Sequence, residues 1–284
     1  MTDAAVKIAC VQMTAGPETG PNLDAAATLI REAAADGAKF ILTPENTSII
    51  EPNRAQALAK SFTQDEHPGL PFFSKLAKEL GVWLLIGSMP IRVEAERLAN
   101  RSFLIDDQGQ ITAQYDKIHL FDVDLPNGEV YRESERIRAG AQAVLAPTPF
   151  GPLGLTVCYD LRFPHLYRDL AKAGATIIGI PAAFTVPTGE AHWHVLLRAL
   201  AIETGAFVLA PAQCGTHAGN RRTYGHSLIV APWGEILAEA GDQPGTISAE
   251  LDFSKVAAVR SMVPSLRHDR DYARPQPGLR AAGE

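Results

Sequence analysis

The fold is decided by residues 153–180, LGLTVCYDLRFPHLYRDLAKAGATIIGI. An apolar, strand-like run, Leu153–Cys158, precedes a helix-like segment, Pro164–Ala173, and a second apolar run follows at Thr176–Ile180. Pro164 suits the first turn of a helix, because the N–H that proline lacks is not needed there. Strands that alternate with helices predict an α/β protein in which helices cover a largely buried sheet.

The same alternation extends through most of the chain. We expect further strands at Val6–Met13, Phe40–Thr43, Val82–Gly87, Ser102–Ile105, Ile111–Tyr115, Phe207–Ala210, His226–Val230 and Glu235–Ala240, and helices at Asn22–Ala35 (with Asn22 as N-cap), Pro71–Leu80 and Glu190–Thr204. Asp106–Gly109 and Ala231–Gly234 are expected to form turns between neighbouring strands. Because no linker or repeat interrupts this pattern, we predict one domain, residues 1–268, and a polar, proline-rich tail, residues 269–284.

The composition of the 284-residue chain excludes several classes of protein. With 46% apolar and 20% charged residues, it is not collagen-like, disordered or a coiled coil. Its 26 lysines and arginines are dispersed and the net charge is −6, so nucleic acid is not an expected partner. Apolar runs such as Ala206–Ala212 are far shorter than the roughly 20 residues that span a membrane, so no membrane partner is expected either.

The N-terminal segment and the cysteine count predict a cytoplasmic protein. Met1–Cys10 contains Asp3 and continues directly into a strand-like run, without the basic start, apolar core and cleavage site of a secretory signal. Three cysteines, an odd number, favour reduced thiols. One of the three can therefore be a free nucleophile.

Cys158 is the candidate nucleophile, because it lies between an apolar strand and the helix that starts at Pro164. A turn of this kind exposes the side chain at its apex, and helix N–H groups that point toward it favour a thiolate and can stabilise an oxyanion. The alternative is a cysteine that only packs in the core. We favour that alternative for Cys10, which lies in mid-strand, and for Cys214, which precedes no helix.

A cysteine nucleophile needs a base and a group that stabilises the oxyanion. Glu45 follows a buried strand, at the sheet edge where active sites of α/β proteins gather, and a partly dry pocket there can raise its pKa and make it a general base. Lys117 follows another strand and can donate to an oxyanion. Taken alone, Glu45 can equally lie in a solvated turn, and Lys117 can pair with Asp116 on the surface.

Histidine is the alternative base, since the chain has eight histidines and a Cys–His pair can perform the same chemistry. His192 and His194 lie two apart on a predicted helix, so their side chains point about 200° from each other and cannot bind one ion together. The sequence has no Cys/His cluster with zinc spacing and no glycine-rich phosphate loop. Neither a metal nor another cofactor is therefore expected.

Several motifs occur together in a fixed order. They are TPEN around Glu45, YDKIHLFDVDLP around Lys117, YRES around Glu133 and GLTVCYDLRFP around Cys158, followed by IPAAFT, TGEAHWHVLLRALAIET, AQCG and TYGHSLIVAPWGEIL. Over nearly the whole chain they resemble the Nit branch of the nitrilase superfamily of carbon–nitrogen hydrolases. The resemblance implies a four-layer αββα sandwich of two sheets and a homo-oligomer, a dimer or larger.

The resemblance also implies a role for each motif residue. Cys158 corresponds to the nucleophile, Glu45 to the general base, Lys117 to the lysine that stabilises the oxyanion, and Glu133 to a glutamate that orients the substrate and the catalytic groups. The backbone N–H of Tyr159 would be the second oxyanion donor. The implied reaction is hydrolysis of an amide through a thioester, with release of ammonia or an amine.

The expected substrate is a small-molecule amide that carries a negative charge. Arg162 corresponds to an arginine that binds a substrate carboxylate in this branch, although it can instead tie the loop after the nucleophile. Phe184 and Thr188 fall at pocket-lining positions. AQCG and TYGHSLIV are most similar to amidases of deaminated glutathione, and KIHLFDVDLP is shared with ω-amidases of 2-oxoglutaramate. The resemblance therefore implies an α-keto acid amide.

Two alternatives and three departures accompany this prediction. The same chemistry also serves hydrolases of N-carbamoyl amino acids and of nitriles, and a catalytically retired nitrilase fold can serve as an interaction protein. His194 stands where the branch usually has Glu, Leu200 where it usually has Arg, and Gly205 where it usually has Gln or Asn. All three lie at or near the predicted long helix, which we expect to pack near the pocket or a subunit interface.

Overall fold

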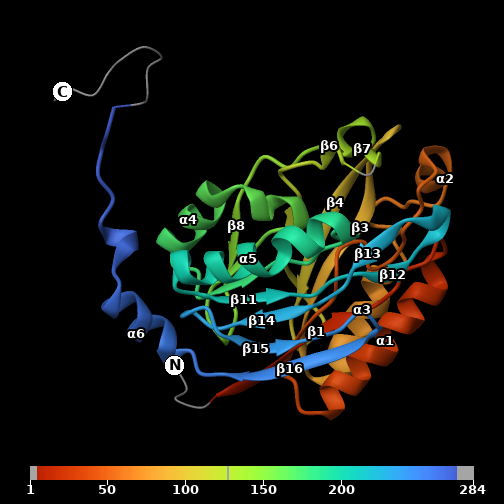
Figure 1. The fold of residues 1–284 in the computed structure, drawn as a ribbon. Coiled ribbons are helices and arrows are strands. Elements are labelled where there is room, and N and C mark those ends of the chain that lie inside the picture. The colour runs from red at the N-terminus through yellow and green to blue at the C-terminus, as the bar shows by residue number, and fades with distance from the viewer. Residues whose placement is uncertain (1–4, 127, 274–284) are drawn as a thin grey trace.

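The first sheet is formed mainly by the N-terminal half of the chain (Figure 1). In spatial order its strands are β16 (Gly245–Leu251), β1 (Val6–Gln12), β2 (Phe40–Leu42), β3 (Trp83–Glu94), β4 (Arg97–Ile105) and β5 (Ile111–Asp116). β1, β2 and β3 are parallel, and the outer pairings are antiparallel. The computed structural model describes residues 5–126 and 128–273.

The second sheet repeats this plan with the C-terminal half. In spatial order its strands are β15 (Ile236–Glu239), β14 (Leu228–Val230), β11 (Phe207–Ala210), β10 (Ile177–Gly179), β9 (Leu153–Leu155) and β8 (Val144–Ala146). β9, β10 and β11 are parallel, as expected for strands joined by covering helices. Two small hairpins, β6–β7 (Asp122–Asp124 and Val130–Arg132) and β12–β13 (Cys214–Thr216 and Arg222–Tyr224), lie outside both sheets.

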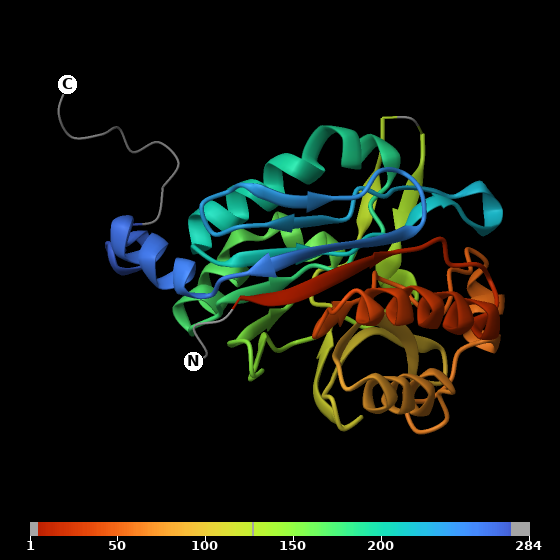
Figure 2. The ribbon, with the colours of Figure 1, turned by 90° about the horizontal axis from the view of Figure 1, so that it is seen from below.

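The layers follow from the burial of both faces of the strands. Along β1, Ile8 and Cys10 join the core between the two sheets, whereas Ala9 and Val11 join a second core under α1 (Thr19–Ala35) and α3 (Gly69–Leu80). Because successive side chains point to opposite faces, such a strand must be apolar at every position. Figure 2 shows the resulting four layers, with α4 (Pro164–Lys172) and α5 (Val186–Thr204) on the outer face of the second sheet.

Two predicted helix starts were wrong. α1 begins at Thr19, and Asn22 lies inside it, where its amide bonds both the N–H and the C=O of Gly16 and the C=O of Ser48. Asn22 is therefore a buried tie between loops and not an N-cap. α5 begins at Val186, so the segment before Glu190 is already helical.

Several elements were missed or predicted too short. β3 continues to Glu94 through an irregularity between Ile86 and Met89, and β4 begins at Arg97. The strand β16 and the helix α6 (Ser254–Met262) were not predicted, because β16 is half exposed and polar and α6 buries only two side chains. A short helix, α2 (Arg54–Ala59), buries none. The predicted hairpins β4–β5 and β14–β15 are confirmed.

The departures from the Nit pattern and the tail occupy different environments. Leu200 packs in the core under α5, and Gly205 ends that helix with φ of 57°, a left-handed conformation that favours glycine. His194 contacts Glu239 on the surface.

Residues 269–273 of the predicted tail are exposed, and residues 274–284 lie outside the described residues. Among the helices that the structure describes, none has the length and apolar character needed to cross a membrane.

Candidate active site

Cys158 begins a tight turn and does not end a strand as predicted. β9 ends at Leu155, and a 3₁₀ helix, Cys158–Arg162, precedes α4. Cys158 has φ of 51°, which is strained for a residue other than glycine, and its N–H donates to the C=O of Pro181 over 2.9 Å. The side chain is only 7% exposed, yet it lines a cavity of about 440 Å³. A strained backbone thus presents the sulfur to that cavity.

Asp160 holds this turn against the strand end that carries Lys117. Its buried carboxylate accepts hydrogen bonds from the N–H of Val157 (2.8 Å) and the hydroxyl of Tyr115 (2.7 Å). Its other oxygen lies 3.0 Å from the backbone nitrogen of His119 and 2.7 Å from Nδ1 of that ring. Because it joins the two segments, Asp160 fixes the position of the sulfur relative to the ammonium group.

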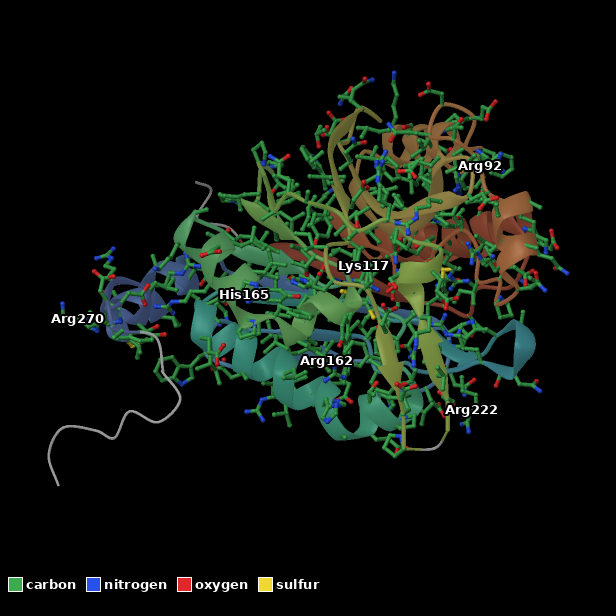
Figure 3. All side chains as sticks on the ribbon, turned by 90° about the horizontal axis from the view of Figure 1, so that it is seen from above. Arg92, Lys117, Arg162, His165, Arg222 and Arg270 are labelled. Atoms are coloured by element: carbon green, nitrogen blue, oxygen red, sulfur yellow. The ribbon has the colours of Figure 1, made fainter. Side chains whose placement is uncertain are left out.

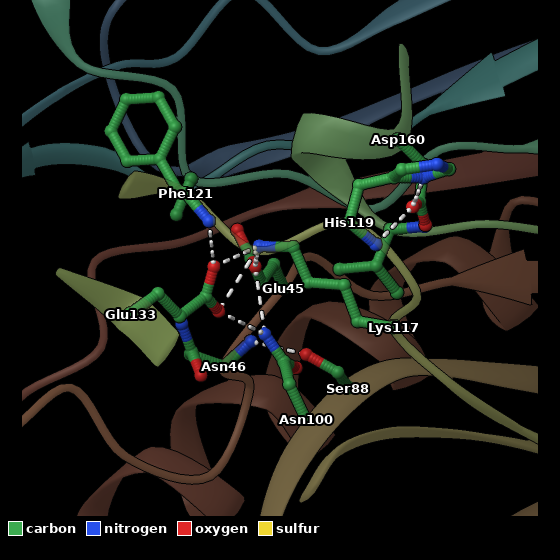
Figure 4. A network of polar contacts seen from close by, with 12 residues as sticks. Glu45, Asn46, Ser88, Asn100, Lys117, His119, Phe121, Glu133 and Asp160 are labelled. Atoms are coloured by element: carbon green, nitrogen blue, oxygen red, sulfur yellow. Dashed lines mark hydrogen bonds and ion pairs between the residues drawn. The ribbon is translucent and has the colours of Figure 1, made fainter. Parts of the chain in front are cut away.

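Lys117 lies in the middle of the molecule (Figure 3), buried between two carboxylates. Its Nζ is 2.9 Å from Oε1 of Glu45, and 3.1 Å and 2.9 Å from the two oxygens of Glu133 (Figure 4). The backbone N–H of Phe121 donates to Glu133 over 2.7 Å and orients that carboxylate. The three charged groups that the sequence motifs predicted therefore form one network.

The loop after β2 is pinned so that Glu45 points into the network. The irregularity in β3 lets Gly87 and Ser88 bond this loop: Gly87 N–H donates to Oγ1 of Thr43, and Ser88 Oγ accepts from the N–H of Asn46. A Cβ at Gly87 would lie 2.0 Å from the C=O of Thr43, so only glycine fits. The side-chain amide of Gln213 donates to the C=O of Glu45 over 3.0 Å.

The thiol of Cys158 and the carboxylate of Glu45 lie close enough to act on each other's pKa. Burial and the negative charge of Glu45 raise the pKa of Cys158 well above its usual value of 9.0, although Lys117 and the N–H of Ala183 act in the opposite direction. Burial would also raise the pKa of Glu45, but the charge and hydrogen bond of Lys117 outweigh it and lower that pKa below 4.5. The resting pair is therefore a neutral thiol and a carboxylate.

Both predicted electrostatic details were thus wrong in direction. The turn at Cys158 does not favour a thiolate in the resting state, because burial outweighs the N–H groups around the sulfur. The pKa of Glu45 is lowered, and not raised, because an ammonium group lies against the carboxylate in the dry site. A carboxylate that is ionised beside a neutral thiol remains in the form that a general base requires.

The cavity has a volume of about 440 Å³, which suits a small organic molecule. Its lining includes every residue of the predicted site: Glu45, Lys117, Glu133, Cys158, Tyr159, Arg162, Phe184 and Thr188. The Arg162 guanidinium carbon lies 5.6 Å from the centre of the Phe184 ring and 5.9 Å from that of Tyr159. The hydroxyl of Thr188 lies 2.9 Å from that of Thr185, at the start of α5.

Asn100, Arg136 and Arg221 are among the lining residues that the sequence analysis missed. Asn100, in the middle of β4, donates to Oε1 of Glu45 (2.9 Å) and to Glu133 (3.3 Å), and its own Oδ1 is buried without a partner in the part of the chain that the structure describes. Arg136 and Arg221 come from loops, and their charges act on each other and on Glu45. Nε of Arg221 is buried and has no hydrogen-bond partner among the described residues.

The charge states predict a broad pH optimum. We expect kcat/KM for a neutral amide to be flat from about pH 5 to about pH 9. Because the pKa of Glu45 is lowered, this base stays ionised above pH 4.5. Activity is lost only as the pH falls through the pKa that Glu45 has in the folded protein. The raised pKa of Lys117 keeps the ammonium charged up to and beyond 10.5. A limb centred between about pH 6 and 8, the range of a histidine, would contradict this assignment.

Comparison with known proteins agrees with this geometry. Residues 7–261 match the family model described as carbon-nitrogen hydrolase. The chain therefore belongs to the carbon–nitrogen hydrolase family and is a hydrolase of carbon–nitrogen bonds. Similar proteins include the deaminated glutathione amidase of Synechocystis sp., 42% identical over 266 residues (92% of this chain, 96% of the relative). The enzyme of that name from Homo sapiens is 39% identical over 272 residues (93% and 82%).

Solved structures confirm the αββα sandwich. The Caenorhabditis elegans NitFhit protein superimposes with a TM-score of 0.89 at 35% identity, over 95% of this chain and 66% of that one. Saccharomyces cerevisiae Nit3, a member of branch 10 of the nitrilase superfamily, gives 0.84 at 29% identity (93% and 96%). An amidase from Nesterenkonia sp. AN1, with the acetamide moiety of fluoroacetamide added covalently at its active-site cysteine, gives 0.80 at 26% identity (95% and 95%).

Proposed function

We propose that this hydrolase is a cysteine amidase that cleaves the amide of a small anionic α-keto acid through a thioester. One observation carries the proposal: the Cys158 thiol, the Glu45 carboxylate and the Lys117 ammonium that contacts this carboxylate line the same cavity, together with several arginines. A nucleophile, a base and a cation thus face one space that a carbonyl group can enter.

In the first half of the reaction, Glu45 takes the thiol proton while the sulfur of Cys158 attacks the amide carbon. The positive charge of Lys117 and the N–H of Tyr159 stabilise the resulting oxyanion. The C–N bond then breaks, the proton on Glu45 passes to the leaving nitrogen, and a thioester remains on Cys158. In the second half, Glu45 takes a proton from water and the hydroxide attacks the thioester. The C–S bond then breaks, the proton on Glu45 returns to the sulfur of Cys158, and the carboxylic acid leaves.

Glu133 determines how Lys117 can act in this sequence. In the resting site the ammonium group is already directed at three carboxylate oxygens, one from Glu45 and two from Glu133. A direct hydrogen bond to the oxyanion therefore requires that one contact with Glu133 be released. We infer that Glu133 positions Lys117 and that the positive charge of Lys117 is its main contribution.

The charges of the cavity favour an anionic substrate. Six cationic side chains line it against four acidic ones, namely Arg54, Lys117, Arg132, Arg136, Arg162 and Arg221 against Glu45, Glu51, Glu133 and Glu135. Lys117 is neutralised by its two carboxylates and Arg132 pairs with Asp124, so the other four arginines are the groups available to a ligand. A buried guanidinium N–H without a partner, as in Arg221, is costly until an acceptor arrives.

Deaminated glutathione and 2-oxoglutaramate both fit this chemistry. Hydrolysis of either would pass through the same 2-oxoglutaryl thioester on Cys158, and only the leaving group differs, a cysteinylglycine dipeptide or ammonia. Similarity to the named relatives favours deaminated glutathione, and its second carboxylate gives the additional arginines a partner. We therefore propose deaminated glutathione as the preferred substrate of the two.

The test measures 2-oxoglutarate formed from each of these two compounds, and ammonia formed from N-carbamoyl-β-alanine. We expect turnover of deaminated glutathione with the highest kcat/KM. Turnover of the carbamoyl compound alone would assign the chain to the N-carbamoyl hydrolases. Turnover of none of the three would favour the retired interaction protein.

Removal of an arginine should affect charged substrates selectively. We expect Arg162→Ala and Arg221→Met each to raise KM for deaminated glutathione about 10- to 100-fold, because each removes a charge-assisted contact with a carboxylate. Neutral amides should be hardly affected. Arg222→Met is the matched control, because Arg222 is exposed, adjacent in sequence and outside the cavity lining (Figure 3). An equal change of KM for charged and neutral amides would show that the arginine does not bind the substrate carboxylate.

Assembly and location remain predictions. We propose a homo-oligomer, and exposed apolar side chains on one surface support it: Val195 and Ile202 lie on the same side of α5, and Trp233 lies in the neighbouring β14–β15 turn. We expect Val195→Glu to have a lower sedimentation coefficient than the wild type, because a charged side chain at the interface would weaken assembly. An unchanged coefficient would place any interface elsewhere. The cysteine count favours a cytoplasmic location, which is likewise a prediction.

A further inference from the structure

Two histidines and a carboxylate gather on the surface away from the cavity. His194 lies on α5, His226 precedes β14, and Glu239 ends β15; α5 contacts β14, which pairs with β15. One nitrogen of each imidazole and one oxygen of Glu239 all lie within 4.8 Å of one another. None of the three residues lines the candidate active site.

The cluster has the geometry of a metal site. Oε1 of Glu239 lies 2.9 Å from Nε2 of His194 and 3.1 Å from Nδ1 of His226. Tetrahedral zinc, with bonds of about 2.0–2.2 Å, places neighbouring ligand atoms roughly 3.3 Å apart. The two contacts with Glu239 therefore need to lengthen by only a few tenths of an ångström to admit the ion, while the two ring nitrogens already lie within 4.8 Å of each other.

His226 is held in place before any ion binds. Its ring stacks on that of Tyr224, with centroids 4.3 Å apart and planes 25° from parallel. The backbone N–H of His226 donates to the C=O of Gly241 over 3.0 Å, and its backbone C=O accepts from Nε1 of Trp193 over 2.7 Å. These contacts hold His226 in a left-handed conformation, with φ of 54°, that is uncommon for a residue other than glycine.

We propose that His194, His226 and Glu239 form a Zn²⁺ site. Two neutral imidazoles and one carboxylate are ligands that zinc prefers, whereas magnesium and calcium prefer oxygen ligands alone. The three side chains are 27–38% exposed, which leaves the fourth position open to water. Because they come from three elements, a bound ion ties α5 to the β14–β15 hairpin and stabilises the folded chain.

The proposed site does not require His192 and His194 to bind the same ion. Residues two apart on a helix cannot converge on one ion, but the partners of His194 come from a different part of the chain. Without metal, the carboxylate can accept hydrogen bonds from both rings, and this interaction alone could explain the cluster. The experiment must therefore distinguish a metal site from a hydrogen-bonded cluster.

The test is a calorimetric titration of tag-free, EDTA-treated protein with Zn²⁺ alone. All variants carry Cys158→Ala, so that the active-site thiol does not compete for zinc. We expect one bound equivalent, and at least about tenfold weaker binding after His194→Ala or Glu239→Gln. The controls are His192→Ala, on the same helix, and Glu235→Gln, on the same hairpin. Both should bind zinc as tightly as the parent, the protein that carries Cys158→Ala alone. Both control residues lie outside the cluster.

Two further readouts keep the result clear. Co²⁺ in place of Zn²⁺ should give the strong visible absorption of tetrahedral coordination in the parent and not in His194→Ala. Zinc should raise the Tm of the parent and leave that of His194→Ala unchanged. Absence of zinc binding by the parent at about 100 μM, or equal affinity in the parent and in both cluster variants, would overturn the proposal and leave a hydrogen-bonded cluster.

Discussion

Replacement of Cys158 by alanine is expected to abolish amide hydrolysis, with a fall in kcat/KM of at least about 10⁴-fold. The variant has no sulfur to form the thioester, while Glu45, Lys117 and the cavity remain. Water activated directly by Glu45 is then the only nucleophile, and it is not held by the strained turn that fixes the sulfur. The comparison is made on 2-oxoglutarate formed from deaminated glutathione.

Cys214→Ala is the matched control for that experiment. Cys214 is also buried and free, but it lies outside the cavity lining, and its sulfur contacts the hydroxyl of Thr14. We expect this variant to keep its kcat and to lose only about 1 kcal/mol of stability. Wild type quenched in acid during turnover should carry the acyl group on the peptide that contains Cys158. An acyl group on another residue, or turnover by Cys158→Ala, would contradict the assignment.

The motifs shared with the Nit branch were sufficient to predict which reactive residues meet, but not their charge states. Glu45, Lys117 and Cys158 each lie within three residues after a strand, at positions that an α/β architecture can bring together, but taken alone Glu45 and Lys117 were equally compatible with the surface. Whether the pKa of Glu45 rises or falls depends on two opposing effects, burial and the charge of Lys117. Their balance depends on a separation of 2.9 Å between groups 72 residues apart, which no local pattern contains.

The residues that surround the reactive groups were the least predictable. Asn100 lies in the middle of a strand, where a polar residue usually indicates a solvated face, but here it is buried against Glu45 and Glu133 from distant segments. Arg136 and Arg221 lie in irregular segments without a periodic pattern. The same limitation applies to His194, because its partners His226 and Glu239 come from a hairpin more than 30 residues away.

Glu45→Gln should separate the general base from the rest of the site. Glutamine keeps the shape of the side chain but cannot take the thiol proton, so we expect kcat to fall about 10²- to 10⁴-fold. The negative charge of Glu45 raises the pKa of Cys158, and Lys117 lowers it. Removal of that charge should therefore lower the pKa of the thiol while hydrolysis is lost.

The two effects are measured on the same protein, the first as 2-oxoglutarate formation and the second as the pH dependence of iodoacetamide alkylation at Cys158. Glu79→Gln is the control, because Glu79 pairs only with Arg31 on the surface among the described ion pairs. If hydrolysis falls and the alkylation profile does not move, Glu45 supports the fold without contacting the sulfur. If hydrolysis persists, another group is the base. A slow hydrolase with a more easily ionised thiol is the result that only a base beside the nucleophile explains.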